Sequence, residues 1–304
     1  MNRHSWLVAS AALLAFPRPA RAQALTPLDV AYAGSMGSMM EGPIKTQAAQ
    51  LLQVDFHGRG QGSDALAQLI VGGSIAPDVF IPVTPSPMLL VLKAGKATTA
   101  VPVARTEMVI AYSPKSKYAQ AFADAAARKR GAMPWWQILA QPDVRFGRTD
   151  PVTDPQGRNI IFTLQLAETY YRQPGLANKI LGQTVNPAQI FTEPSVQARL
   201  QSGEIDAASA YKIQPGPFNI PYVSLPREIN LADDALRAHY AQATLDLNGK
   251  TFHPDPLLYY AAVIAGSAHA DKSNAFVAWL TGAGQAIFKQ YFYDPPTGAA
   301  TLHA

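Results

Sequence analysis

Residues 28–81, LDVAYAGSMGSMMEGPIKTQAAQLLQVDFHGRGQGSDALAQLIVGGSIAPDVFI, carry the clearest structural pattern in the chain. Three short apolar runs in this stretch have the length of buried strands, and two segments between them space their apolar residues as one face of a helix does. The strands are predicted at 28–32, 53–56 and 78–81, and the helices at 38–52 and 65–73, the second one capped by Ser63-Asp64 and ended by Gly72-Gly73. This alternation predicts a βαβαβ unit, and therefore an α/β fold with a parallel sheet covered by helices on both faces.

The alternation of strands and helices starts again near residue 106 and predicts a second lobe. Its strands are predicted at 107–112, 145–149, 190–192 and 205–211, and its helices at 118–130, 135–140, 158–171 and 195–202. Beyond residue 225 the chain is irregular, gives two more strands at 243–247 and 258–264, and ends in two helices that bring no sheet of their own. We therefore expect residues 26–104 and 225–304 to form the first lobe and residues 105–224 the second.

The N-terminal residues 1–22 have the three-part layout of a cleavable secretory signal. A basic start at Arg3 precedes an apolar run over 6–16, and Ala20-Arg21-Ala22 supplies the small residues of a cleavage site. The apolar run is shorter than the roughly 20 residues that span a bilayer, which disfavours a membrane anchor. We expect residues 1–22 to be removed and the protein to be periplasmic.

Composition excludes several classes of protein. The 304 residues include 25 Lys and Arg, 21 Asp and Glu, and no Cys, so disulfide frameworks, zinc ribbons and thiolate nucleophiles are excluded. Three of the arginines fall within 1–22, and without them 22 basic residues face 21 acidic ones. A chain so close to neutral lacks the excess of positive charge that is typical of proteins that bind nucleic acid.

Motifs for catalysis and for metal binding are missing from the sequence. It contains no P-loop, no dinucleotide-binding glycine pattern after a strand, no H-E-x-x-H and no G-x-S-x-G. The run GRGQG, 58–62, lacks the lysine and the glycine spacing of a phosphate cradle and is predicted to be a plain loop. The six histidines include no i, i+4 pair. We expect neither an enzyme nor a bound cofactor or resident metal.

Five short polar turns recur where a predicted strand passes into a helix. They are YAGS at 32–35, GSD at 62–64 with Ser63, TPSP at 84–87, DPQG at 154–157 and EPS at 193–195. Helix N-termini expose unpaired backbone N–H groups and a partial positive charge, so several of them facing one gap would bind an anion without lysine or arginine. The alternative is that each turn is an ordinary βα loop.

Six segments follow, in order, the pattern of a known family. They are YAGSMGSMM, GSDALAQLI, APDVFI, FGRTDPVTDPQGRN, LQSGEIDAASAY and YVSLPREINL. Over most of its length from Leu28 onward the chain resembles the periplasmic molybdate/tungstate-binding proteins of ABC transporters. The resemblance implies a type II periplasmic binding fold, in which two hinged lobes close around one oxyanion. It also implies a monomer that delivers the anion to an inner-membrane permease.

The resemblance further implies a set of anion-binding residues from both lobes. The positions that match the family's donors are Gly34, Ser35, Gln156, Gly157, Val196 and Tyr211. Asp154 matches a carboxylate that coordinates the metal centre of the anion in this family. Without the resemblance, Asp154 can also be the N-cap of a helix whose first residue is Pro155, and Tyr211 can also be a tyrosine buried inside the lobe. Arg148 either supports the DPQG turn or pairs with a surface acid.

Two departures from the family pattern leave the identity of the anion open. Pro82 stands where the family has a serine donor, so Thr84 or Ser86 is expected to supply that contact. Ala210 stands where the family has a second carboxylate. The alternatives are therefore the same fold with sulfate or an organic anion as its ligand, or a non-transport periplasmic protein that has reused the fold.

Overall fold

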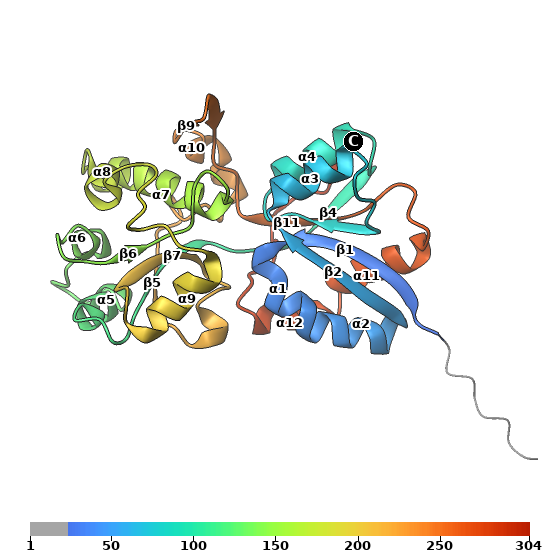
Figure 1. Ribbon diagram of the computed structural model, residues 1–304, viewed down its shortest axis with the longest axis horizontal. Coiled ribbons are helices and arrows are strands. Elements are labelled where there is room, and N and C mark those ends of the chain that lie inside the picture. Colours follow the sequence, from blue (N-terminus) through green and yellow to red (C-terminus); the bar gives the residue numbers. More distant parts are fainter. Residues whose placement is uncertain (1–23) are drawn as a thin grey trace, which may run out of the picture.

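The structure is a computed structural model that describes residues 24–304, so the predicted signal peptide at 1–22 lies outside the described residues. Figure 1 shows two parts side by side, each built around its own sheet. We call them the first lobe, which holds the six-stranded sheet, and the second lobe, which holds the four-stranded sheet. In the described part of the chain, no helix combines the length and the apolar character needed to cross a membrane.

The sheet of the first lobe has the strand order β12-β4-β11-β3-β1-β2. Its strands are β1 (Thr26–Ala33), β2 (Val54–Gln61), β3 (Val79–Ile81), β4 (Thr99–Arg105), β11 (Leu258–Val263) and β12 (Leu302–His303). β1 pairs in parallel with β2 and β3, as the βαβαβ pattern predicts. β11 is antiparallel to both β3 and β4, so the sheet is mixed rather than parallel. The reason is that β11 enters the sheet as the chain returns from the second lobe.

Helices cover both faces of this sheet. One face carries α3 (Ser63–Val71) and α4 (Pro85–Lys93), which bury Leu66, Ile70 and Met88 against it. The other face carries α2 (Lys45–Leu52), α11 (Ala270–Thr281) and α12 (Gln285–Gln290), and here Phe276 packs on Phe56 with ring centroids 6.0 Å apart. β1 reaches α2 through three short helical segments, Gly34–Met36, Gly37–Met39 and Met40–Ile44. The last two helices thus pack on the first lobe.

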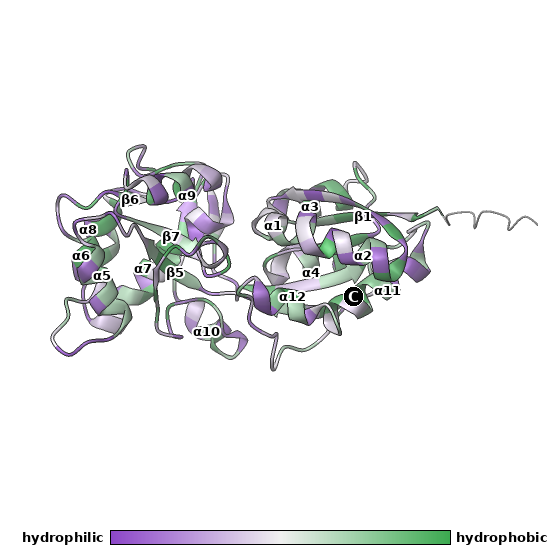
Figure 2. Ribbon diagram, turned by 90° about the horizontal axis from the view of Figure 1, so that it is seen from below, coloured by the Kyte–Doolittle hydropathy of each residue, from purple (hydrophilic) through white to green (hydrophobic). Residues whose placement is uncertain are grey.

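The second lobe has the strand order β6-β7-β5-β8. Its strands are β5 (Met108–Tyr112), β6 (Phe146–Gly147), β7 (Ala207–Tyr211) and β8 (Tyr222–Ser224), and its helices are α5 (Ala119–Ala126), α6 (Trp135–Leu139), α7 (Pro155–Tyr171), α8 (Leu176–Leu181) and α9 (Glu193–Ser202). α9 buries Val196 and Leu200 on one face of the sheet. The other helices cover the opposite face. Figure 2 shows hydrophobic residues along β5 and β7 and more hydrophilic ones on the outer helices.

The predicted loop at 57–62 is instead mostly strand. β2 runs to Gln61 and stays paired with β1 over its whole length. Gly58 and Gly60 lie under the ring of Tyr32, whose hydroxyl donates to Glu41 at 2.6 Å, and a Cβ at Gly60 would come within 2.9 Å of that ring. Gly58 and Gly60 are therefore part of a strand that the Tyr32 ring covers. The sequence pattern alone predicted a loop here.

The segment 225–257, which the sequence assigns to the first lobe, packs on the second. It contains the short helices Asp234–Leu236 and α10 (Arg237–Tyr240) and the hairpin of β9 (Leu245–Leu247) and β10 (Lys250–Phe252). Gln165 of α7 exchanges two hydrogen bonds with the backbone of Thr244. The Arg158 guanidinium of α7 lies 4.6 Å from the ring centre of Phe252. The chain thus rejoins the first sheet only at β11.

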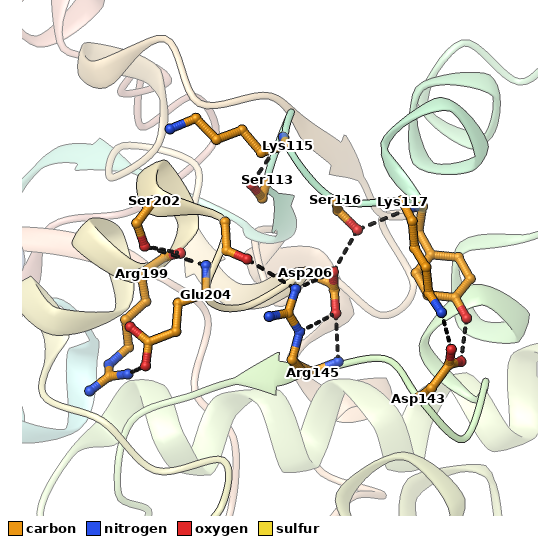
Figure 3. Close-up of polar contacts among 12 residues, drawn as sticks. Ser113, Lys115, Ser116, Lys117, Asp143, Arg145, Arg199, Ser202, Glu204 and Asp206 are labelled. Carbon is orange, nitrogen blue, oxygen red and sulfur yellow. Dashed lines mark hydrogen bonds and ion pairs between the residues drawn. The ribbon is translucent and has the colours of Figure 1, made fainter.

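A buried carboxylate ties the starts of β6 and β7 together (Figure 3). Asp206 accepts hydrogen bonds from the backbone N–H and the guanidinium of Arg145, and one from the Ser116 hydroxyl. Burial alone would raise the pKa of Asp206, but these bonds hold it below its ordinary value. This network fixes β6, and the chain after β6 enters residues 149–154, several of which line the cleft between the lobes.

Candidate functional site

A cleft of about 520 Å³ lies between the two lobes. Its walls come from the ends of strands and the starts of helices on both sides. The first lobe contributes Ala33, Gly34, Ser35, Gln61, Gly62, Ser63 and Val83. The second lobe contributes Thr149, Asp150, Thr153, Asp154, Pro155, Gln156, Ile190, Phe191, Thr192, Glu193 and Tyr211. Four of the five predicted turns therefore face one hollow.

The parallel pairing of β1 with β2 explains how two turns of the first lobe come together. The register places Ala33 opposite Gln61 at the carboxyl ends of the two strands. Gly34 and Ser35 follow the first strand directly, and Gly62 and Ser63 follow the second. Both pairs therefore leave the sheet at the same edge, which is where ligands bind in open α/β folds.

Ser35 brings its hydroxyl to the cleft from the turn after β1. Its Oγ lies 3.1 Å from the Oη of Tyr259 on β11. Each hydroxyl can donate or accept, so this pair leaves one donor proton for a ligand. Burial raises the pKa of Tyr259, which keeps its hydroxyl protonated.

Tyr211 faces the cleft from the end of β7 and is only 3% exposed. Its hydroxyl oxygen accepts a hydrogen bond from Asn159 Nδ2 at 2.9 Å. That bond occupies the acceptor side and leaves the O–H proton free to donate into the cleft. Burial, and then the charge of Asp154, raise the pKa of Tyr211 well above its ordinary value. The interior and cleft readings of this residue both hold, because the ring is buried and the residue lines the cleft.

Asp154 is the N-cap of α7 and also lines the cleft. Its Oδ1 accepts a hydrogen bond from the backbone N–H of Gln156 at 2.9 Å, and Pro155 occupies the first helical position. Burial raises the pKa of Asp154, against the lowering effect of the Gln156 N–H. The sequence left a cap and a metal-centre ligand as alternatives. The structure shows the cap, with the carboxylate at the cleft wall.

Gly157 does not line the cleft but allows the turn beside it to form. A Cβ at this position would lie 2.5 Å from the carbonyl oxygen of Thr149 and 2.7 Å from the nitrogen of Pro151. Its own N–H is bonded to the Asp154 carbonyl at 3.1 Å. Gly157 therefore lies where the backbone of α7 packs closely against the backbone of residues 149–151.

We expect Gly157→Ala to push residues 149–151 away from α7. Overpacking of this kind costs about 1–3 kcal/mol, which thermal unfolding would detect as a fall of several degrees in Tm. Gly37→Ala is the matched control, because a Cβ at Gly37 meets nothing within 4 Å and its φ is helical. An unchanged Tm for Gly157→Ala would show that the turn is not packed as described.

Three other predicted residues lie away from the cleft. Thr84 precedes α4, and the N–H of Ser86 is bonded to the Asp255 carboxylate at 3.2 Å. The N–H of Val196 is used inside α9, where it bonds to the Thr192 carbonyl, and its side chain packs in the core under that helix. None of these three residues is among those that line the cleft.

Ser63 lines the cleft, but its hydroxyl already has a partner. Its Oγ accepts a hydrogen bond from the N–H of Val83 at 3.1 Å, immediately after Pro82. The hydroxyl proton of Ser63 remains available to donate. The first lobe thus supplies its hydroxyls from Ser35 and Ser63.

Two residues at the cleft were missed by sequence reasoning. Thr149 has a buried hydroxyl without a hydrogen-bond partner among the described residues. Glu193, the first residue of α9, lines the cleft opposite the first lobe. The EPS turn that contains Glu193 was recognised as a helix start, but its carboxylate was not considered.

Among the described residues, the charged side chains that line the cleft are all acidic. Asp150, Asp154 and Glu193 belong to its wall, and no described Lys or Arg does. Arg158 of α7 donates to Asp64 of the first lobe at 2.9 Å and so bridges the two lobes. Binding of an anion here must rely on hydroxyls, amides and helix N-termini.

Arg148 does not line the cleft but supports the part of its wall that the second lobe contributes. Its side chain is fully buried and donates to the carbonyls of Gln183 and Thr184 and to Oε1 of Gln189. Burial lowers the pKa of Arg148 to about 10. Neither alternative from the sequence describes it, because it holds the loop 183–189, which leads directly into the cleft residues 190–193.

Comparison with known proteins agrees with this architecture. The molybdate/tungstate-binding protein WtpA of Thermococcus kodakarensis is 30% identical over 218 residues, which cover 64% of this chain and 60% of that protein. A putative ABC transporter molybdenum-binding protein of Haloferax volcanii is 27% identical over 282 residues, which cover 89% and 86%. The chain thus spans about 60% of the length of the curated relatives that head the comparison.

Solved structures show the same fold. The periplasmic molybdate-binding protein of Azotobacter vinelandii superposes with a TM-score of 0.59 at 16% identity, over 89% of this chain and all of that one. The fold is that of the type II periplasmic binding proteins, as expected. The family described as bacterial extracellular solute-binding protein matches residues 28–294, and its members bind solutes for transport and are not enzymes. By that match, the chain belongs to the bacterial extracellular solute-binding protein family.

Proposed function

We propose that this chain captures a molybdate or tungstate oxyanion in the cleft and delivers it to an ABC permease in the cytoplasmic membrane. The observation that carries the proposal is the gathering of four polar turns from both lobes around one hollow, which no lysine or arginine of residues 24–304 lines. Two of the relatives are named for molybdate or molybdenum binding. The proposed place of action is the periplasm, and the proposed form is a monomer.

The donors of the cleft suit a small tetrahedral oxyanion. Ser63 and Tyr211 each have a hydroxyl proton to give, and the Ser35–Tyr259 pair has one more between its two hydroxyls. A neutral donor that bonds to a charged partner contributes about 1.5–3 kcal/mol. Because the donors come from two lobes, closure would bring them to one geometry and so set the size of the anion that fits.

Isothermal titration calorimetry with four anions tests the proposal. The purified chain, freed of carried-over anion by dialysis, is titrated with molybdate, tungstate, sulfate and phosphate. We expect one site per chain that prefers molybdate or tungstate. Equal or tighter binding of sulfate or phosphate would contradict the proposed ligand, and binding of none of the four would contradict the proposed function.

A second candidate ligand is a larger organic anion. It is favoured by the missing family contacts at Pro82 and Ala210, and the cleft of about 520 Å³ has room to admit it. The overall size of the protein in solution, measured with tungstate added, tests whether the lobes close on a small anion. Small-angle scattering should show a smaller radius of gyration with tungstate bound if the lobes close on a small anion.

A further inference from the structure

Glu193 is held at the cleft wall by a buried network of side-chain amides. Its Oε1 accepts a hydrogen bond from Gln214 Nε2 at 2.5 Å. The same Nε2 also donates to Oε1 of Gln156 at 2.8 Å, and Oε1 of Gln214 accepts from the backbone N–H of Tyr211 at 2.7 Å. Gln156 and Gln214 are 3% and 6% exposed. The position of this carboxyl group is therefore fixed from behind.

Among the described residues, no cation contributes to the pKa shift of Glu193. The titratable side chains that act on it or are acted on by it are Asp154 before α7, Tyr211 on β7, Tyr259 on β11 and Tyr293 after α12. Burial raises the pKa of Glu193, the hydrogen bond from Gln214 lowers it, and the charge of Asp154 raises it again, with a net upward shift. Asp150, another acid, belongs to the same cleft wall.

Two ionised carboxylates at the wall would repel a dianion that enters the cleft. A carboxyl group changes from an acceptor to a donor when it takes up a proton, and a poorly solvated site can keep it in that form. Asp154 stands at the N-terminus of α7, where its Oδ1 accepts the Gln156 N–H and the positive end of the helix dipole favours the ionised carboxylate. Among the described residues, Glu193 Oε2 has no hydrogen-bond partner, so a proton there is free to point to a ligand.

We propose that Glu193 binds the anion in its protonated form, as a hydrogen-bond donor, so that each anion enters the cleft together with one proton taken from solution. The inference rests on the proposed function, since it needs an anion in this cleft. Affinity should rise as the pH falls. Where free protein is ionised and bound protein is protonated, Kd should change by at most about tenfold per pH unit.

Calorimetry with tungstate as the probe measures the proton directly. Titrations at about pH 6 and about pH 8, each in two buffers of different ionisation enthalpy, give the number of protons taken up per anion. We expect up to one proton for the unaltered chain and a weaker Kd at the higher pH. Glu193→Gln should bind without proton uptake and with a Kd independent of pH, because its amide N–H donates at every pH.

Two further variants assign the proton to one residue. Glu204→Gln removes an exposed carboxylate that pairs with Arg199 beyond the other end of α9, and its proton uptake should equal that of the unaltered chain. Asp154→Asn keeps a good N-cap residue and should retain uptake. Uptake lost in Asp154→Asn but kept in Glu193→Gln would place the proton on Asp154 and overturn the inference.

The remaining outcomes separate the inference from the function beneath it. Tight tungstate binding with no proton uptake at either pH would overturn the inference and leave the function standing. Loss of binding by a folded Glu193→Gln variant at both pH values would show that the ionised carboxylate is required, which also overturns it. Failure of the unaltered chain to bind molybdate, tungstate, sulfate or phosphate at either pH would overturn both.

Discussion

Tyr211→Phe is expected to weaken binding of molybdate or tungstate about ten- to a hundredfold, because it removes one hydroxyl donor to a charged ligand. The Tyr211 oxygen already accepts from Asn159, so its own proton is the one that a ligand would receive. Phenylalanine keeps the buried ring and removes only the oxygen. Calorimetry with the variant and the unaltered chain measures the ratio of the two Kd values.

A second tyrosine provides the control for this experiment. Tyr112 is buried on β5 of the same sheet but does not line the cleft. Tyr112→Phe should leave the Kd unchanged. Tyr211→Phe also leaves Asn159 Nδ2 without its partner, so we expect a loss of about 1–3 kcal/mol in the free energy of unfolding as well. An unchanged Kd in Tyr211→Phe would place the anion outside this cleft.

Arg148→Met is expected to have the largest effect on stability. The guanidinium is fully buried and donates to two carbonyls of the 183–189 loop and to the side chain of Gln189. Methionine fills part of the space but gives up the three hydrogen bonds that the guanidinium donates, each worth about 1 kcal/mol or more because the donor is charged. Chemical denaturation should therefore show a loss of about 3 kcal/mol or more.

The same substitution should also loosen one wall of the cleft. The backbone of Arg148 pairs with residues 189 and 191, and the cleft residues 190–193 follow directly. Anion affinity should fall together with stability. Arg130→Met is the control, since Arg130 is exposed, and its free energy of unfolding should change by less than about 0.5 kcal/mol. An equally small change in Arg148→Met would show that the buried guanidinium does not hold the loop.

The fold could be predicted from sequence wherever the pattern is local. The strands at 28–32 and 78–81 and the helix at 65–73 follow from apolar spacing and glycine stops. β1 contains the first strand, and β3 and α3 overlap most of the other two segments. The continuation of β2 through Gly58 and Gly60 depends on the ring of Tyr32 in the neighbouring strand. A pattern along one segment carries no such information.

The residues of the candidate site also fall into two groups: those that local sequence marks, and those that only tertiary contacts place. Gly34, Ser35 and Asp154 stand at strand-to-helix turns that the sequence marks, and they line the cleft. Ser86 stands only four residues from Pro82, but its N–H is bonded to Asp255, which lies far along the chain. Glu193 owes its position to Gln214, which is 21 residues away. Neighbours that only the tertiary fold brings together could not be predicted.

The proposed function requires turns from both lobes to enclose a single anion. A crystal structure of the chain with tungstate, with data collected at an energy where tungsten scatters anomalously, would locate that anion. We expect one strong anomalous peak per chain, within hydrogen-bonding distance of Ser35 from the first lobe and Tyr211 from the second. A peak bound to one lobe alone, or no peak in the cleft at saturating tungstate, would contradict it.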